Sequence, residues 1–190
     1  MEFMIGARAS CSDGFCGEVD RMVLDPGARV LTHLVIEQRH LPGPGRLVPL
    51  DLVEATAADV RLGCTLAEFG NLEYADETHL VEGVGPLGPR GEQAPMGIPH
   101  PAQAISEHIV PPGETELQSE RVHAADGEIG RVQGLLVDAD DHRLTHVLLR
   151  EGHLWGRREV AIPVSLVTGI YGGIHLSVTK KQIGHLPSVR

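Results

Sequence analysis

The feature of this sequence that most constrains its fold is an internal repeat. Shifted by 113 positions, residues 13–36 match residues 126–149 without a gap, and eight of the 24 aligned pairs are identical. One extra residue in the second copy changes the offset to 114, at which Pro49 matches Pro163 and Thr65 matches Thr179. Self-similarity of this extent indicates a tandem duplication, so the chain is expected to contain two copies of one small fold.

Each copy has the pattern of short β-strands joined by tight turns. Asp13-Gly14 and Asp126-Gly127 are equivalent dipeptides of the kind found in hairpin turns, because glycine accepts a positive φ. Residues 30–36 and 144–149 are rich in Val, Leu, Ile and Thr and have the length of strands. The two aligned prolines cannot donate a backbone hydrogen bond, so they are predicted at strand starts or in edge strands.

A short helix is predicted at the end of each copy. Thr65 with Glu68, and Thr179 with Gln182, have the spacing of a capping box, in which the two side chains bond each other's backbone amides. Several short strands followed by one short helix are typical of a small barrel closed at one end. The sequence therefore predicts a mainly β protein made of two tandem small β-barrels.

The composition changes between the copies. Residues 84–113 contain seven of the 13 prolines, and residues 75–118 carry seven acidic side chains and one arginine. Such a segment buries too little apolar surface to fold alone. We therefore divide the chain into a first copy (1–74), an acidic linker rich in Pro and Gly (75–118) and a second copy (119–190). A small barrel buries only roughly 60% of its unfolded surface, so the two copies are expected to pack as a pseudo-twofold pair.

Charge and cysteine content exclude several classes of protein. The formal net charge is −10, whereas a nucleic-acid-binding surface needs excess positive charge. No apolar run approaches the roughly 20 residues of a membrane-spanning helix, and the first ten residues lack a signal-peptide core. Cys11, Cys16 and Cys64 cannot all pair within the chain. These features predict a cytoplasmic protein with neither nucleic-acid binding nor direct membrane insertion.

Short motifs recur along both copies. Those of the first copy are Gly6-Ala-Arg8, Asp13-Gly14, Gly17-Glu18-Val19, Leu24-Asp25, Thr32-His33-Leu34-Val35 and Val48-Pro49-Leu50-Asp51-Leu52-Val53. Those of the second are Asp126-Gly-Glu-Ile-Gly130-Arg-Val132, Leu136-Val137-Asp138, Thr145-His146-Val-Leu-Leu149 and Gly152-His-Leu-Trp-Gly156-Arg-Arg-Glu-Val160-Ala-Ile-Pro163-Val. Together they resemble the PRC-barrel domain, and the last is similar to a form found in bacterial tandem proteins. The resemblance covers about residues 4–72 and 122–189.

The resemblance implies a six-stranded β-barrel for each copy. Members of the family include the cytoplasmic part of the photosynthetic reaction-centre H subunit and the C-terminal domain of a ribosome maturation factor. Because those tasks differ greatly, the family implies a fold and a tendency to bind proteins, and no chemistry. The sequence shows neither the transmembrane helix of the first nor the additional barrel of the second, so neither role is expected here.

Three groups of residues are candidate sites. His33 and His146 occupy equivalent strand positions and are weak candidates for a metal-binding or pH-sensing pair; half-buried strand histidines bonded to backbone groups are the favoured interpretation. Cys11 and Cys16 flank a predicted turn and could form a redox pair. Their counterparts in the second copy are Ala and Ile, so ordinary apolar positions explain both cysteines better.

The third group lies in the second copy. Trp155, Arg157 and Arg158 fall between two predicted strands, and tryptophan and arginine are enriched where proteins bind each other. The alternative is that Trp155 packs over its own barrel or against the other copy. We interpret the three residues as a candidate protein-binding site.

No motif for catalysis, phosphate binding or metal binding is present in the sequence, so we expect a non-enzyme without a cofactor. The leading hypothesis is a cytoplasmic adaptor or scaffold for a protein partner of unknown identity. The alternative is a sensor that binds a small ligand or metal in the barrel interior or at His33 and His146. Assembly with a membrane-bound complex, by analogy with the H subunit, is a third hypothesis. A homodimer is also expected, because small barrels expose strand edges.

Overall fold

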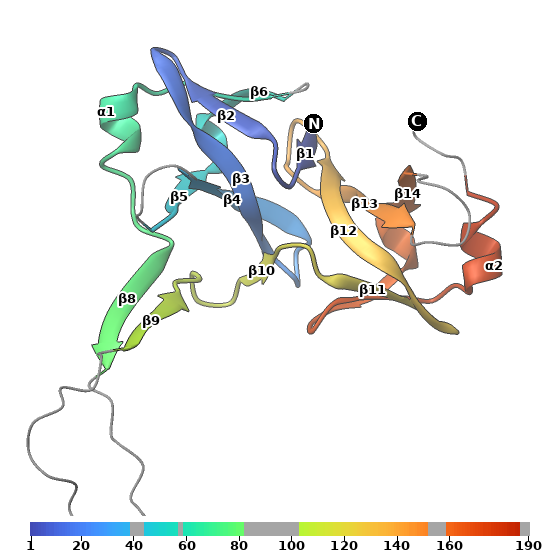
Figure 1. The fold of residues 1–190 in the computed structure, drawn as a ribbon. Coiled ribbons are helices and arrows are strands. Elements are labelled where there is room, and N and C mark those ends of the chain that lie inside the picture. Colours follow the sequence, from blue (N-terminus) through green and yellow to red (C-terminus); the bar gives the residue numbers. More distant parts are fainter. Residues whose placement is uncertain (39–43, 57–58, 82–102, 152–158, 187–190) are drawn as a thin grey trace, which may run out of the picture.

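The computed structural model describes residues 1–38, 44–56, 59–81, 103–151 and 159–186. In this part of the chain the protein is mainly β, with two curled seven-stranded sheets and a separate two-stranded ribbon (Figure 1). Six strands of the first sheet come from the first copy, and six strands of the second sheet come from the second copy.

The first sheet has the strand order β5-β4-β3-β2-β7-β6, with β10 beside β3. Its strands are β2 (Arg8–Cys11), β3 (Gly14–Asp25), β4 (Val30–Glu37), β5 (Arg46–Pro49), β6 (Val53–Thr56), β7 (Val60–Leu62) and β10 (Thr115–Leu117). A 3-10 turn, η1 (Leu50–Leu52), joins β5 to β6, and the short helix α1 (Leu66–Phe69) follows β7.

The second sheet repeats this arrangement with the order β14-β13-β12-β11-β16-β15 and β1 beside β12. Its strands are β1 (Glu2–Met4), β11 (Arg121–Ala124), β12 (Gly127–Val137), β13 (Leu144–Glu151), β14 (Glu159–Pro163), β15 (Val167–Ile170) and β16 (Ile174–Leu176). The turn η2 (Val164–Leu166) and the helix α2 (Lys180–Ile183) stand where η1 and α1 do. The structure therefore repeats as the sequence does.

Both sheets curl but stay open in the part of the chain that the structure describes. The strands at the two ends of each order, β5 with β6 and β14 with β15, are not paired with each other. The edge of β5 bonds to residues 73–75 instead: the Leu47 amide donates to the Glu73 carbonyl at 2.9 Å, and the Ala75 amide to the Gly45 carbonyl at 2.8 Å. The sequence predicts two small β-barrels, each closed at one end, whereas the described strands form curled open sheets.

The predicted helix caps are confirmed. The Glu68 amide donates to Oγ1 of Thr65 at 3.3 Å, and the Thr65 amide donates to Oε2 of Glu68 at 2.8 Å. At α2 the Thr179 amide donates to Oε1 of Gln182 at 2.9 Å. The prolines predicted for strand starts or edge strands are the last residues of β5 and β14, the outermost strands in their orders.

The aspartates of the two predicted hairpin turns also bond the helices. Asp13 lies between β2 and β3, and its Oδ1 accepts a hydrogen bond from the Leu66 amide at 2.8 Å. Asp126 lies between β11 and β12, and its Oδ1 accepts from the Lys180 amide at 2.9 Å. Each aspartate satisfies an amide of the first helical turn that has no partner within the helix. One side chain thus joins each hairpin to the helix that ends its copy.

The second sheet takes its seventh strand from the start of the first copy, and the first sheet takes its seventh strand from the segment that precedes the second copy. β1 pairs antiparallel with β12 of the second sheet, with Phe3 opposite Leu135. β10 pairs antiparallel with β3 of the first sheet, with Glu116 opposite Val23. Because β1 and β10 stand 113 residues apart, which is the offset of the repeat, the exchange is reciprocal.

The two sheets also meet at equivalent hairpin loops. The Leu31 amide donates to the His142 carbonyl at 3.0 Å, and the Leu144 amide donates to the Arg29 carbonyl at 2.8 Å. Arg29 and His142 both adopt the left-handed conformation, with φ of 55° and 56°, which is uncommon for residues other than glycine. The Arg29 guanidinium also donates to two carbonyls around η2, at 3.1 and 3.2 Å. These reciprocal contacts relate the copies by a pseudo-twofold axis.

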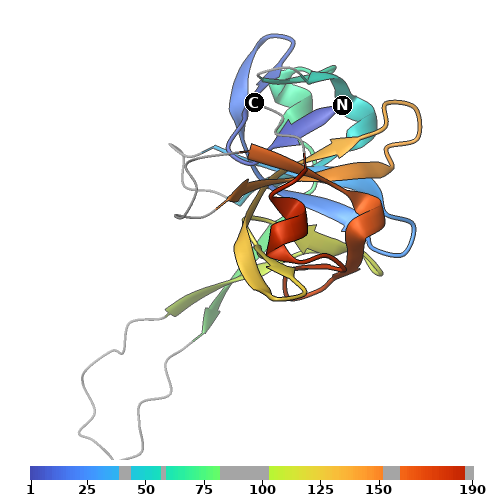
Figure 2. The ribbon, with the colours of Figure 1, turned by 90° about the vertical axis from the view of Figure 1, so that its right-hand side faces the viewer.

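The segment interpreted as a linker contributes three strands. β8 (Asp76–Val81) and β9 (Gln103–His108) pair antiparallel as the ribbon, which extends away from both sheets (Figures 1 and 2), and β10 joins the first sheet. Each of these strands obtains its order from backbone pairing with another segment. Residues 75–118 therefore form strands although they contain no long apolar run.

One apolar core extends across both copies. It contains buried residues of both sheets, together with Phe3 of β1 and Leu117 of β10, which are 0% and 1% exposed. Each exchanged strand thus places a large apolar side chain in a core built mainly by other strands. Burial of this kind is the main favourable term in folding.

Replacing Phe3 with alanine is expected to destabilise the whole protein. Truncating a fully buried phenylalanine costs about 3–5 kcal/mol, because it removes apolar burial and leaves a cavity. Urea unfolding of Phe3→Ala should show this loss. Phe15→Ala is the matched control, since Phe15 is 45% exposed and its loss should cost less than about 1 kcal/mol. Equal losses for the two variants would contradict the placement of β1 in the core.

Candidate functional site

The site begins with a charge buried in the first sheet. Among the described residues, Arg21 of β3 is the charged side chain that is fully buried, with 2% exposure. The equivalent position in β12 is Gly134, where an added Cβ would lie 2.2 Å from the carbonyl oxygen of Phe3. The exchanged strand β1 therefore excludes a side chain from this position in the second sheet. A buried guanidinium requires partners, because a charge is costly to remove from water.

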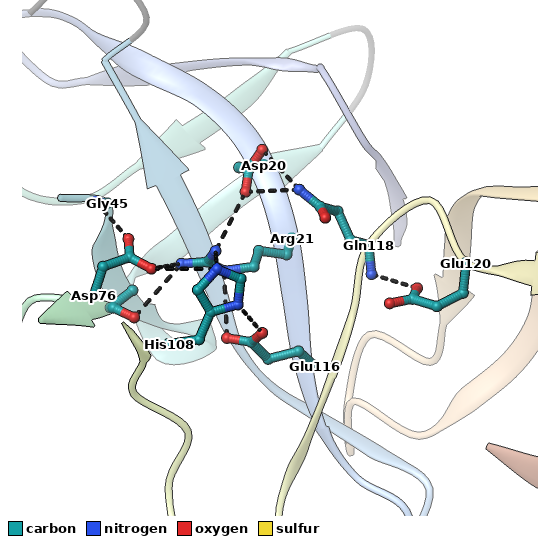
Figure 3. Close-up of polar contacts among 9 residues, drawn as sticks. Asp20, Arg21, Gly45, Asp76, His108, Glu116, Gln118 and Glu120 are labelled. Atoms are coloured by element: carbon teal, nitrogen blue, oxygen red, sulfur yellow. Dashed lines mark hydrogen bonds and ion pairs between the residues drawn. The ribbon is translucent and has the colours of Figure 1, made fainter. Parts of the chain in front are cut away.

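Two carboxylates supply the main countercharge. Nη2 of Arg21 donates to Oδ1 of Asp76 at 2.5 Å, and Nε lies 3.3 Å from Oε1 of Glu116 (Figure 3). Asp20, the preceding residue, lies 3.7 Å from Nη1. Oδ2 of Asp76 accepts the Gly45 amide at 3.1 Å, which fixes that carboxylate beside β5. The arginine of β3 is thereby bonded to β8 and β10.

His108 of β9 completes the arrangement. Its Nε2 lies 2.8 Å from Nη1 of Arg21, and its Nδ1 lies 2.7 Å from Oε2 of Glu116. A guanidinium has only donors, so Nε2 must be the acceptor and must carry no proton. Nδ1 then carries the proton and donates to the Glu116 carboxylate. The geometry assigns His108 the neutral Nδ1–H tautomer. We call Arg21, Asp76, His108 and Glu116 the charge cluster.

Two acidic side chains near the charge cluster have raised pKa values, chiefly because they are themselves buried. The pKa of Glu37 is raised, first by burial and then by the nearby Asp20 and Asp76 carboxylates, against the lowering effect of Arg21. The pKa of Glu120 is raised by its own burial and by Glu116. The buried Arg21 thus stands among an excess of carboxyl groups.

The charge cluster joins strands that are far apart in the sequence. Arg21, Asp76, His108 and Glu116 belong to β3, β8, β9 and β10, so the base of the ribbon is bonded to the first sheet. Oδ1 of Asp76, Oε2 of Glu116 and both imidazole nitrogens have polar partners within the cluster, whereas Nε of Arg21 and Oε1 of Glu116 are an ion pair at 3.3 Å without a hydrogen bond. The arrangement suits a clamp that fixes the direction of the ribbon rather than acid–base chemistry on a substrate.

The two histidines singled out in the sequence have different surroundings. Nδ1 of His33 lies 3.0 Å from Oγ1 of Thr32 and 3.6 Å from Oε2 of Glu114. Nδ1 of His146 is buried and has no hydrogen-bond partner. Both stand opposite the terminal proline of the neighbouring strand. No group of three or more side chains suited to holding a metal occurs among the residues described.

The cysteines lie in the core of the first copy. All three are buried and unpaired, and Sγ of Cys11 lies 4.0 Å from Sγ of Cys64 rather than facing Cys16 alone. Burial raises the pKa of the Cys11 thiol to about 12 and that of Cys64 to about 11. Protonated, buried thiols fit apolar packing positions, as the sequence favours for Cys11 and Cys16.

Trp155, Arg157 and Arg158, the candidate protein-binding residues, lie outside the described part of the chain. Sequence reasoning missed the charge cluster. The available signal was Arg21, a charge placed directly before the apolar run Met22, Val23 and Leu24. Its partners come from the segment interpreted as a linker, so their contribution could not be recognised without the long-range pairing.

Comparison with known proteins gives no match, either among models of protein families or among curated proteins. In the described ranges no helix is both long enough and apolar enough to cross a membrane.

Arg21→Met is expected to destabilise the protein strongly. Removing one partner of a buried ion pair costs about 3–5 kcal/mol, since the Asp76 and Glu116 carboxylates lose their countercharge. The loss is measured by urea unfolding, with Arg61→Met as the control because Arg61 is exposed on β7. A loss no larger than that of the control would show that Arg21 does not hold the cluster together.

Glu37→Gln is expected to stabilise the protein at pH 7 and not at pH 4. A raised pKa in the folded state means that the folded protein binds the proton more tightly, so ionised Glu37 costs stability at neutral pH. Below about pH 4 the carboxyl is protonated in both states and the cost disappears. Urea midpoints of both proteins at the two pH values measure the effect.

Glu68→Gln provides a control of opposite sign. Hydrogen bonds from Thr65 lower the pKa of Glu68, so its ionised form contributes stability at pH 7 that is lost as the pH falls. This variant should be less stable than the natural protein at pH 7 and approach it at low pH. A pH-independent difference for Glu37→Gln would contradict the assignment of its raised pKa.

Proposed function

We propose that this protein is a non-catalytic adaptor or scaffold that binds a partner protein in the cytoplasm through the ribbon of β8 and β9. In this proposal the two curled sheets serve as a rigid base, and each sheet corresponds to one copy of a PRC-type domain. The observation that carries the proposal is the ribbon itself, which extends away from the sheets and is fixed at its base by the charge cluster (Figures 2 and 3).

The backbone of the ribbon suits strand addition. β8 and β9 pair in continuous register from Asp76 opposite His108 to Val81 opposite Gln103. In the described part of the chain neither strand has a second neighbour beyond this pair. An open strand edge presents a row of backbone donors and acceptors, which is a template for a strand of another chain.

The charge cluster stabilises the ribbon and fixes its direction. A two-stranded ribbon is marginally stable by itself in water. Here Asp76 and His108, the first pair of its ladder, are bonded to the buried Arg21. Fixing a binding element beforehand lowers the ordering cost of association. The ribbon is thus held in one direction before a partner arrives.

Two further features support a binding rather than a catalytic role. The charged side chains of the charge cluster interact with one another, and the interior of both sheets is filled by one apolar cluster. The sequence resemblance to PRC-barrels favours protein binding as well. Trp155, Arg157 and Arg158, in the connection between β13 and β14, are proposed as a second contact for the same partner.

The ribbon hypothesis is tested with two replacement variants. In the first, residues 78–106 are replaced by Asn-Gly, a dipeptide that joins Glu77 to Glu107, which stand opposite each other. In the second, only residues 82–102 are replaced by Asn-Gly, so that β8 and β9 remain. Both keep Asp76 and His108, and thus the charge cluster. Quantitative pull-down from native cells, read by mass spectrometry, compares them with the full chain.

The proposal predicts that the full chain and the second variant retain a stoichiometric partner and that the first variant loses it. Unchanged melting temperatures would show that all three proteins are folded. Retention of the partner by the first variant would remove the ribbon from the binding site. Loss from both variants would assign binding to residues 82–102 instead of the ribbon.

A further inference from the structure

Three arginines stand side by side across the second sheet. Arg121 of β11 is directly opposite Arg131 of β12, and Arg131 is directly opposite Arg150 of β13. Residues directly opposite on neighbouring strands project to the same face, with Cβ atoms about 4.5–5.5 Å apart. The three side chains, which we call the arginine row, therefore start within about 10 Å of one another.

The arginine row faces solvent. All three residues are exposed, whereas their neighbours Val122, Val132 and Leu149 are buried in the core. The row thus stands on the outer face of the sheet. Like charges directly opposite on neighbouring strands destabilise a sheet, so the row costs stability without contributing to the core.

The first sheet has a different set of charges at the equivalent positions. Arg8, Glu18 and Glu37 stand opposite one another in the same register on β2, β3 and β4. That row carries both signs of charge, whereas the row of the second sheet carries only positive charge. The duplicated fold therefore does not require the arginines, which points to a function of the second sheet alone.

The contacts of the arginine row leave donors for a ligand. Nη1 of Arg121 lies 3.2 Å from Oε2 of Glu128, and Nη1 of Arg131 donates to the Ser119 carbonyl at 2.9 Å. Glu159 of β14 stands opposite Arg150. Each guanidinium has five N–H donors in a planar fork, so these contacts occupy a minority of the fifteen donors in the row.

We propose that the arginine row binds a phosphate monoester, presented by the partner protein as a phosphorylated side chain. This rests on the proposed function, because it names a chemical feature of the same partner. A phosphate group carries nearly two negative charges and three strong acceptor oxygens at neutral pH. Guanidinium forks match these oxygens in bidentate geometry, which one ammonium group cannot provide.

The distribution of charge favours a compact anion over an extended one. The protein has a net charge of −10, and residues 119–190 carry nine basic and eight acidic side chains. A nucleic acid or a long acidic segment would extend past the row onto acidic surface, including Glu128 and Glu159, and would be repelled there. A single phosphate group concentrates its charge within the length of the row.

The proposal is tested by NMR titration of the full ¹⁵N-labelled chain with a short peptide, acetyl-Ala-Ala-phosphoserine-Ala-Ala-amide. Matched arms use the unphosphorylated peptide, the same peptide with glutamate, and inorganic phosphate. The phosphopeptide should shift amide signals of β11, β12 and β13 and bind more tightly than the other three. Affinity should fall as the pH drops through about 6, where the second phosphate proton is taken up.

In the double variant Arg131→Glu with Arg150→Glu, the row of the second sheet has one arginine and two glutamates, as the equivalent row of the first sheet has. This variant should weaken phosphopeptide binding at least about tenfold, as expected for the loss of charge-assisted hydrogen bonds. Arg8→Gln is the control, because Arg8 belongs to the equivalent row of the first sheet, which carries both signs of charge. The affinity of this variant for the phosphopeptide should be unchanged. Amide spectra verify that both variants are folded.

Each contrary result has a definite meaning. Equal binding of the glutamate peptide would overturn the preference for phosphate, and equal binding of inorganic phosphate would overturn a protein-borne source. Absence of any shift, or affinity unaffected by the double substitution, would remove the site altogether. None of these results changes the outcome of the ribbon variants, so failure of this inference and failure of the proposed function are distinguishable.

Discussion

The reciprocal exchange of β1 and β10 is the constraint on which the rest of this structure depends. The second sheet receives its seventh strand from the start of the first copy, the first sheet receives its seventh strand from the segment before the second copy, and each of these strands contributes a fully buried side chain. A fold of some 70 residues has a small core and is marginal by itself. Joining the two cores through exchanged strands removes that weakness, because neither copy is complete without the other. The hairpin contacts of Arg29 and His142 strengthen the same union.

Within this symmetric framework, function is assigned to positions where the copies differ. Arg21 is matched by Gly134, so only the first sheet can bind a ribbon through a buried guanidinium. Glu18 is matched by Arg131, so only the second sheet presents a row of positive charge. Duplication thus provides stability, and divergence provides two chemically different surfaces. The proposed adaptor role would use this combination of a rigid base with separate contact sites.

Sequence reasoning succeeded where the chemistry is local. The turns at Asp13 and Asp126 and the capping boxes at Thr65 and Thr179 depend on residues within four positions of one another. It failed where pairing is long-range: β1 and β10 have no identical residue at equivalent positions, and their partners are more than 90 residues distant. The charge cluster was missed for the same reason, since composition alone could not reveal that acidic residues of the linker surround Arg21.

The central claim is that the ribbon, fixed by the charge cluster, is the element that a partner protein recognises. Hydrogen exchange of the full chain, free and in complex with the partner that it captures, tests this most directly. The account predicts that the partner slows exchange at the amides of β8 and β9, because strand addition would occupy their open edges. Slowed exchange elsewhere, with β8 and β9 unchanged, would contradict it.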